Sequence, residues 1–351
     1  MNDLLVGVLT ALLATNSPST VSNWLTARPL PPLTSTQSAT NSASATNSPS
    51  DLALKRVMEL DDQVRAEIDD LITQSNTDTA SASSASDKLL KERIKAKLLT
   101  VRNAYEEFVR LYPTHAKGRS AFGAFLNDSD DEEGSMTQWL KAKELNPKDP
   151  AAWNNLANLY GHRGPVTNAF YHYAKAIELN PWESTYYHNL ATTLYLFRSD
   201  GAKVLKKEVT AVMYDAMALY RRALELDPTN FILAADFAQS YYGFAQPKSG
   251  DPKADLLART KLADEALKAW TNAFLIARDD IERQGVQIHF ARLNINAGRY
   301  DIARQAMAAI TNSMYDVTKK ALEAKIETLL KAKDEAPKAD TKPVSEGKTT
   351  P

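Results

Sequence analysis

Residues 149–181 read DPAAWNNLANLYGHRGPVTNAFYHYAKAIELNP and contain two amphipathic segments separated by a predicted turn. In the first segment the large apolar side chains recur at three- and four-residue spacing, as the buried stripe of a helix requires: Trp153, Leu156 and Tyr160. Asp149 supplies an N-cap, and Pro150 occupies the first helical position. Small residues at 157, 169 and 176 let two helices approach closely. The stretch therefore predicts a tightly packed helical hairpin.

The hairpin recurs along the chain with a period of 34 residues. Pro113, Pro147 and Pro181 lie 34 residues apart, and each ends an amphipathic segment. Pro228 ends a fourth segment 47 residues after Pro181, and the 13 additional residues fall around 198–210, between its two helices. Self-similarity at a fixed period of this length indicates a helical repeat array.

Residues 150–181 resemble the tetratricopeptide repeat (TPR) family. The resemblance is carried by Trp153, Leu156, Ala157, Tyr160, Ala169, Tyr173, Ala176 and Pro181, of which only Ala157 departs from the Gly of the family pattern. Copies of graded fidelity begin near Ala116, Ser184, Phe231 and Gln284. The resemblance implies an all-α fold, a right-handed superhelical solenoid of TPR hairpins that binds other proteins.

The repeat register predicts five parts of the chain. Residues 1–50 form an apolar N-terminal segment and a Ser/Thr/Asn-rich disordered tether, 51–115 a degenerate N-terminal repeat or capping helices, 116–312 five TPR-like repeats, 313–333 a C-terminal capping helix, and 334–351 a disordered tail. Two of the repeats carry insertions, around 198–210 and 244–260. The helix expected at 51–73 supplies the missing first helix of the degenerate repeat. The expected apolar stripe of the cap is Val317, Leu322, Ile326, Leu329 and Leu330.

Residues 4–13, LLVGVLTALL, form an apolar run whose role the sequence leaves open. The run is too short to span a bilayer, which takes roughly 20 residues. Its length suits a signal peptide, but residues 1–3 contain an acid and no base. The alternative is a short amphipathic helix that docks on the chain or on a partner. We expect a cytoplasmic protein, with an exported or periplasmic one as the alternative and with membrane association only through this run.

Composition excludes several classes of protein. The 42 basic and 43 acidic side chains leave no basic footprint for nucleic acid. Only 12 of 351 residues are Gly, which disfavours β-barrels, Rossmann sheets and P-loops. The absence of Cys excludes disulfides, thiolate metal sites and a cysteine nucleophile.

The sequence contains no recognisable catalytic or cofactor-binding motif, and we predict no enzyme activity, no cofactor and no metal. The histidines lack the helical spacing of a metal pair, and His162 and His172 are interpreted as a turn residue and a helix-surface residue. The acidic run at 128–133 lacks the alternation of a calcium loop and is interpreted as a solvated turn. An enzyme that uses the array to position substrate is the least favoured class.

The resemblance implies that the first helix of each hairpin lines a concave groove for a peptide or helix of a partner protein. The groove-facing candidates are Asn154, Asn158, His162, His188, Asn189, Thr192, Tyr195, Gln239, Tyr242 and Arg292. One TPR subgroup grips a C-terminal carboxylate with cations, but this chain has Asn154, Ile232 and Asp236 at those positions. The predicted function is a non-catalytic adaptor or scaffold, and the alternative is an exported assembly or structural factor of the cell envelope. The sequence does not indicate the partner or the oligomeric state.

The N-terminal residue of the native protein distinguishes these two functions. For a cytoplasmic adaptor we expect mass spectrometry of the soluble fraction to find Met1 or Asn2 intact, because no signal peptidase acts on it. A mature chain that starts after the apolar run would instead establish export.

Overall fold

The computed structural model describes residues 48–77, 84–245 and 248–335, and within these ranges every regular element is a helix. The N-terminal expectations for residues 1–47, and residues 336–351 of the tail expected at 334–351, lie outside the described residues, whereas residues 334 and 335 belong to the last helix. None of the described helices has the length and hydropathy needed to cross a bilayer. The chain divides into two compact units, residues 1–227 and 228–351.

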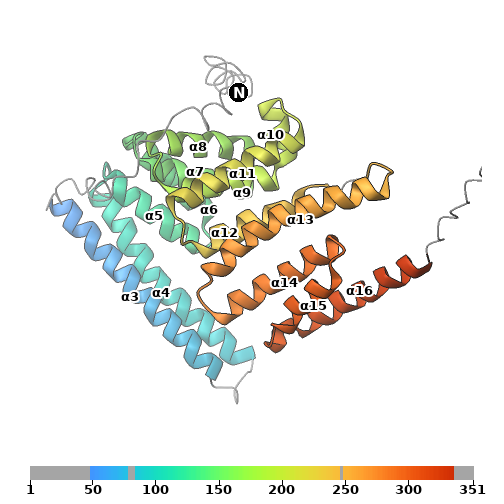
Figure 1. Cartoon of the computed structure of the whole chain (residues 1–351). Helices are drawn as coiled ribbons and strands as arrows, with labels where there is room; N and C mark the ends of the chain where they lie inside the picture. The colour runs from blue at the N-terminus through green and yellow to red at the C-terminus, as the bar shows by residue number, and fades with distance from the viewer. Residues whose placement is uncertain (1–47, 78–83, 246–247, 336–351) are drawn as a thin grey trace, which may run out of the picture. The chain divides into compact units, whose positions relative to one another are not determined.

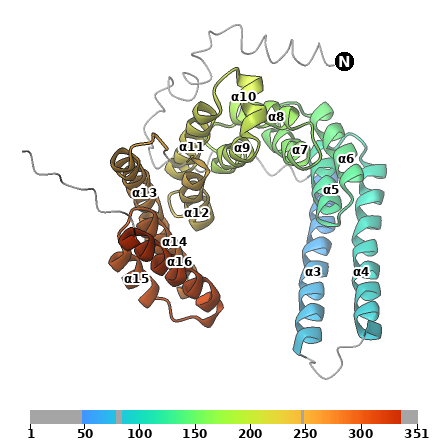
Figure 2. The ribbon, with the colours of Figure 1, turned by 90° about the vertical axis from the view of Figure 1, so that its right-hand side faces the viewer.

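The first unit is a series of packed helix pairs (Figure 1). Its helices are α3 (Pro49–Thr77), α4 (Ser84–Leu111), α5 (Ala116–Asp128), α6 (Glu132–Leu145), α7 (Pro150–Arg163), α8 (Val166–Leu179), α9 (Ser184–Leu196), α10 (Arg198–Leu205) and α11 (Val209–Leu226). The pairs are α3 with α4, α5 with α6, α7 with α8, and α9 with α11, and consecutive pairs also pack on each other. Figure 2 shows this stacking from α4 to α11. The described residues form the all-α solenoid predicted from the sequence.

Small residues close each hairpin. Ala157 of α7 and Ala169 and Ala176 of α8 are 0% exposed, and so are Ala191, Ala216 and Ala223 in the α9–α11 pair. With only a methyl group at these positions, the two helices can pack closely. Leu156, which is also 0% exposed, packs beside this contact, and burial of such a side chain contributes about 1.5–3 kcal/mol.

A second regularity lies at the junction between hairpins. The carbonyl oxygens of Pro113, Pro147 and Pro181 follow a helix end, where no backbone donor is available to them. In each case a side chain six residues later donates the missing hydrogen bond: Arg119 Nε at 3.3 Å, Trp153 Nε1 at 2.8 Å and Tyr187 Oη at 3.1 Å. These three donors lie 34 residues apart, so the sequence period is also a hydrogen-bonding period.

The 13 additional residues of the α9–α11 pair form a helix of their own, α10. Gly201 in α10 is buried, and a Cβ there would lie 3.0 Å from the Val212 side chain and 3.1 Å from that of Leu194. The insertion is therefore packed onto the hairpin it interrupts rather than extended into solvent.

The hairpin α3–α4 begins the described part of the first unit. Its core contains Leu54 and Val64 of α3 and Val101, Tyr105 and Phe108 of α4, packed against Phe122, Phe125 and Leu126 of α5. Tyr105 donates a hydrogen bond to the carboxylate of Asp61 at 3.2 Å, and burial raises the pKa of this tyrosine. Whether this hairpin is a degenerate repeat stays a prediction.

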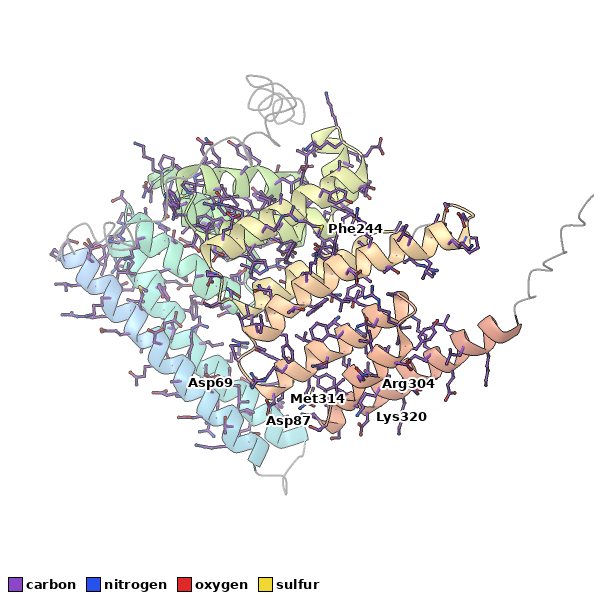
Figure 3. The ribbon with its side chains drawn as sticks, viewed as in Figure 1. Asp69, Asp87, Phe244, Arg304, Met314 and Lys320 are labelled. Atoms are coloured by element: carbon purple, nitrogen blue, oxygen red, sulfur yellow. The ribbon has the colours of Figure 1, made fainter. Side chains whose placement is uncertain are left out.

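The second unit contains α12 (Phe231–Ser240), η1 (Tyr241–Gly243), α13 (Pro252–Leu275), α14 (Asp280–Asn296), α15 (Tyr300–Ala308), η2 (Ser313–Tyr315) and α16 (Asp316–Glu335). The second half of the predicted insertion at 244–260 is helical, because α13 begins at Pro252 with an Asp251 cap. Arg304, labelled in Figure 3, joins α15 to α16 through Glu323 at 2.8 Å.

The apolar stripe expected on the terminal helix is only partly buried. Leu322 and Ile326 are 7% and 0% exposed, and Leu330 is partly buried against the same cluster. The prediction was wrong for Val317, which is 81% exposed, and for Leu329, which is 37% exposed. Val317 lies five residues before Leu322, about 140° around the helix at 3.6 residues per turn, so it faces away from the buried stripe of α16.

Two glycines in helices of similar length should respond oppositely to Ala. A Cβ at Gly123 would lie 2.5 Å from the ring of Trp139, so Gly123→Ala forces that ring to move and should lower the free energy of unfolding by about 1–3 kcal/mol. At Gly161 nothing lies within 4 Å, and Gly161→Ala should raise it by about 0.5–1 kcal/mol. Urea denaturation measures both. Equal effects of the two substitutions would contradict the close α5–α6 contact.

Candidate peptide-binding face

Three asparagines meet where α7 and α9 pack side by side. Asn154 and Asn158 are one turn apart on α7, and Asn189 lies in the second turn of α9. The 34-residue period brings these first helices of consecutive hairpins together, so side chains far apart in sequence become neighbours. We call Asn154, Asn158 and Asn189 the amide cluster.

The amide cluster is held by a defined set of hydrogen bonds. Asn189 Nδ2 donates to Asn154 Oδ1 at 3.1 Å and to Asn158 Oδ1 at 3.3 Å. Asn158 Oδ1 also accepts from the hydroxyl of Tyr173 on α8 at 2.7 Å. Burial raises the pKa of Tyr173 to about 12, so this hydroxyl stays protonated as the donor. These contacts fix both the position and the orientation of the Asn158 amide.

The same bonds leave three polar groups of the amide cluster without a partner among the described residues: Nδ2 of Asn154, Nδ2 of Asn158 and Oδ1 of Asn189. Asn154 is only 7% exposed, so it mainly anchors Asn189, whereas Asn158 and Asn189 are half-buried. The cluster therefore offers two hydrogen-bond donors, the Nδ2 groups of Asn154 and Asn158, and one acceptor, Oδ1 of Asn189, in a fixed arrangement. This combination matches the hydrogen-bonding groups of a peptide backbone.

Three further candidates from α9 lie along the same helix, and two of them contact Tyr220 of α11. Thr192 Oγ1 lies 2.9 Å from the Tyr220 hydroxyl, and the ring of His188 lies 5.8 Å from the Tyr220 ring. Tyr195, the third, is half-buried, and its ring lies 5.8 Å from the guanidinium carbon of Arg198. These positions extend the polar face by two turns beyond Asn189.

Of the remaining four candidates, His162 lies in the first unit and the other three lie in the second. His162 is exposed in the last turn of α7. In the second unit Gln239 and Arg292 are exposed, and Tyr242 is half-buried, with its hydroxyl 3.1 Å from Nδ1 of His289. His289 in turn stacks on Trp270 with ring centroids 3.8 Å apart. That these ten residues bind a partner stays a prediction.

Two residues of this face were missed by the sequence analysis, which treated them as core residues only. Tyr173 and Tyr220 occupy the same position of the second helix in consecutive repeats, and each hydroxyl reaches a candidate on the first helix. The available signal was the choice of Tyr over Phe at a core position, because a buried hydroxyl needs a hydrogen-bond partner.

The interpretation of His172 as a helix-surface residue was wrong, because it is 6% exposed. Its ring lies among Trp153, Tyr160 and Tyr171, with centroid distances of 5.2, 5.0 and 5.4 Å. Nδ1 donates to the Asn168 carbonyl at 2.8 Å, and Nε2 accepts from Lys143 Nζ at 3.4 Å. Burial lowers the pKa of His172 to about 4 and also lowers the pKa of Lys143. His172 is therefore a neutral packing residue between consecutive hairpins.

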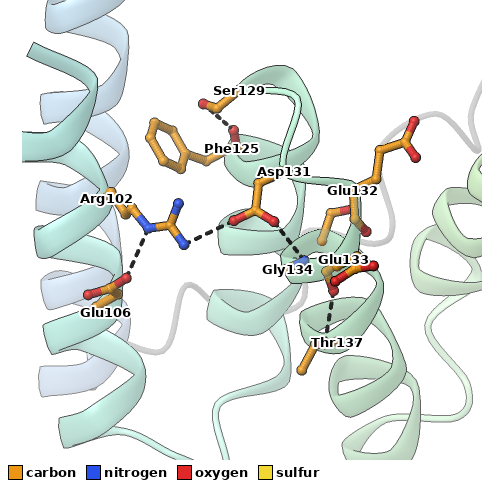
Figure 4. A network of polar contacts seen from close by, with 10 residues as sticks. Arg102, Glu106, Phe125, Ser129, Asp131, Glu132, Glu133, Gly134 and Thr137 are labelled. Carbon is orange, nitrogen blue, oxygen red and sulfur yellow. Dashed lines mark hydrogen bonds and ion pairs between the residues drawn. The ribbon is translucent and has the colours of Figure 1, made fainter. Parts of the chain in front are cut away.

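The acidic run at 128–133 forms contacts within the protein (Figure 4). Asp131 accepts from the backbone N–H of Gly134 at 2.9 Å as the cap of α6, and from Arg102 Nη2 at 2.9 Å. Asp128 pairs with Arg65 at 3.1 Å, and Glu132 pairs with Arg163 at 3.3 Å. In the described ranges no group of three or more His, Asp or Glu side chains is arranged to hold a metal ion.

Comparison with known proteins agrees with this architecture. No family model matches the chain. The Photosystem I assembly protein Ycf3 of Cyanophora paradoxa is 24% identical over 141 residues, which cover 38% of this chain and 82% of Ycf3. The hairpins, their 34-residue period and the repeat positions above give the chain the architecture of tetratricopeptide repeats, which it resembles.

Two solved structures are similar to this chain. YrrB, described as a TPR protein with an unusual peptide-binding site, has a TM-score of 0.44 and 15% identity and covers 66% of this chain and 98% of its own. The pilF protein of Pseudomonas aeruginosa has a TM-score of 0.47 and 10% identity and covers 78% of this chain and 99% of its own.

The buried His172 should make the TPR array less stable in acid. Its pKa falls from 6.5 in the unfolded chain to about 4 in the folded one, so between these values the unfolded chain binds the additional proton. The free energy of unfolding should therefore fall as the pH is lowered from 6.5 to 4, by about 3 kcal/mol for this residue. His172→Phe removes this proton uptake, and urea denaturation at several pH values measures the change in slope.

The exposed His162 provides the matched control for this measurement. If His172→Phe and His162→Phe have the same pH dependence, the burial of His172 does not control acid stability.

Proposed function

We propose that this chain is a non-catalytic adaptor or scaffold that binds an extended segment of a partner protein along the first helices of its repeats. The amide cluster carries this proposal. Its unpartnered donors and acceptor complement main-chain carbonyl and N–H groups, which every peptide presents when its backbone is extended. A helical partner has already used those groups internally, so the amides favour an extended segment.

The neighbouring side chains support the same mode of binding. Thr192 and His188 form a polar patch around Tyr220, and the half-buried ring of Tyr195 provides an aromatic surface for apolar side chains. The amides are uncharged, so this binding should depend on salt only weakly, unlike recognition of a carboxylate by cations.

The similarity to Ycf3 motivates a second, narrower proposal. Ycf3 is a photosystem assembly protein, and the similarity covers 82% of its length. We infer that the partner segment belongs to a subunit that this chain delivers to, or holds in, a larger complex. The proposal includes a cytoplasmic site of action, which the state of the native N-terminus tests.

Substitutions in the amide cluster test the binding proposal. A random peptide library selected on the full chain supplies a synthetic ligand, whose affinity is then measured by fluorescence anisotropy. Asn158→Ala and Asn189→Ala should each weaken binding about fivefold to tenfold, since a hydrogen bond contributes about 1–1.5 kcal/mol. Glu178→Ala, an exposed change on the second helix α8, should leave the affinity unchanged. Equal affinities for all three variants would place the ligand elsewhere.

A further inference from the structure

Helix α5 runs along only part of the α3–α4 hairpin. At its start, Nε2 of the N-cap His115 lies 3.2 Å from Oδ1 of Asp51 in the first turn of α3. At its end, Oδ2 of Asp128 lies 3.1 Å from Nη2 of Arg65. Helix α3 continues to Thr77, about 18 Å past Arg65. Figure 2 shows α3 and α4 continuing side by side beyond α5.

The part of the hairpin past Arg65 has an apolar surface that the described residues do not bury. None of the described side chains at 66–75 and 87–100 is buried. Four of them, two on each helix, form what we call the apolar strip: Ile68, Ile72, Ile94 and Leu98. Ile72 is 40% exposed, and the other three are half-buried. Two helices alone form a single layer, and an apolar surface of this kind normally packs against a second layer.

Ion pairs show that the apolar strip lies on the same side of the hairpin as α5. Arg65 of α3 pairs with Asp128 at the end of α5, and Arg102 of α4 pairs with Asp131 just before α6. The strip residues of α3 follow Arg65 by three and seven residues, and those of α4 precede Arg102 by four and eight, so they continue the same helix faces. A short helix placed end to end with α5 would therefore cover the strip.

The apolar run at residues 4–13 has the pattern and the length of such a helix. Its large apolar residues recur at the spacing of one helix face: Leu5, Val8, Leu9 and Leu12. Asp3, Gly7 and Thr10, which are polar or small, have the spacing of the opposite face. Ten residues of helix are about 15 Å long, which fits the 18 Å, approximately, of α3 past Arg65.

The connection between this run and α3 has a suitable length. Residues 14–48 link the run to Pro49, where α3 begins. The middle of the apolar strip, near residue 70, lies about 32 Å along α3 from Pro49. A random chain of about 35 residues has a root-mean-square end-to-end distance of about 30–35 Å. Since this distance matches the span, the effective concentration of the run at the strip is near its maximum, about 1 mM.

We propose that residues 4–13 cover the apolar strip of the same chain as a helix placed end to end with α5. Because α5 occupies the neighbouring part of this side, the space suits one short helix rather than a second hairpin. The run supplies the second layer that the end of the hairpin requires. This inference goes beyond the adaptor function and does not depend on it, because the amide cluster is built by α7 and α9.

A single thiol on the apolar strip tests the proposal in the full chain. The chain contains no Cys, so Ile72→Cys introduces a unique thiol. Its reaction with a maleimide should be about tenfold slower than in the same chain carrying Val8→Asp/Leu12→Asp, which puts two charges on the apolar face of the run. A tenfold effect corresponds to a dissociation constant of about 0.1 mM for the run as a free peptide, at an effective concentration of about 1 mM.

Two controls match this measurement. Gly7→Asp/Thr10→Asp puts the same charges on the opposite face of the run and should leave the thiol protected. Leu89→Cys supplies a reference thiol, because Leu89 is 63% exposed and lies nine residues, two and a half turns, before Leu98, on the other side of α4. Its reaction rate should be the same in all backgrounds.

Amide hydrogen exchange gives a second readout that needs no added thiol. Exchange at 66–75 and 87–100 should be faster with Val8→Asp/Leu12→Asp than with Gly7→Asp/Thr10→Asp, because only the first variant uncovers the apolar strip.

The protection should not depend on protein concentration, since the run and the apolar strip belong to one chain. Four outcomes would overturn the proposal: equal reaction rates with and without Val8→Asp/Leu12→Asp, equal loss of protection in both Asp variants, protection that grows with protein concentration, or a native mature chain that lacks residues 4–13. Growth with concentration would assign the strip to a second copy.

Discussion

The α7–α8 and α9–α11 hairpins depend on contact between two helices across alanine. Ala157, Ala169 and Ala176 are fully buried, and any larger side chain there would separate α7 from α8. This close approach fixes how one hairpin is offset from the next, and repetition of the offset brings the first helices of consecutive hairpins together. The hydrogen bonds of Asn189 with Asn154 and Asn158 span that contact. The α7–α9 contact that forms the candidate binding face therefore depends on the separation of α7 and α8.

The sequence predicted the parts of this structure that follow from spacing. Proline period, small residues and apolar stripes are one-dimensional signals, and they predicted the repeat architecture and the hairpin helices from α5 onward. Two side chains were placed wrongly. Val317 lies five residues before Leu322, about 140° around the helix, so it faces away from the buried stripe of α16. His172 has the polarity of a surface residue, yet it lies between two hairpins, which periodicity does not encode.

The binding face was partly predictable for the same reason. Repeat register placed Asn154, Asn158 and Asn189 on the first helices, but it could not show that they bond to one another or that Asn154 is nearly buried. The roles of Tyr173 and Tyr220 required the distance between two helices, which is a three-dimensional quantity.

The junction bonds to Pro113, Pro147 and Pro181 bear on how freely such a chain can change. The donors are a guanidinium, an indole and a phenol, which differ in size, charge and shape. The proline carbonyl requires only one N–H or O–H at the right distance, so an exchange among these three residue types keeps the hydrogen bond at the junction. Copies can therefore diverge at this position while the array keeps its curvature. Related chains can therefore share the backbone of this protein with little residue identity at the junctions between hairpins.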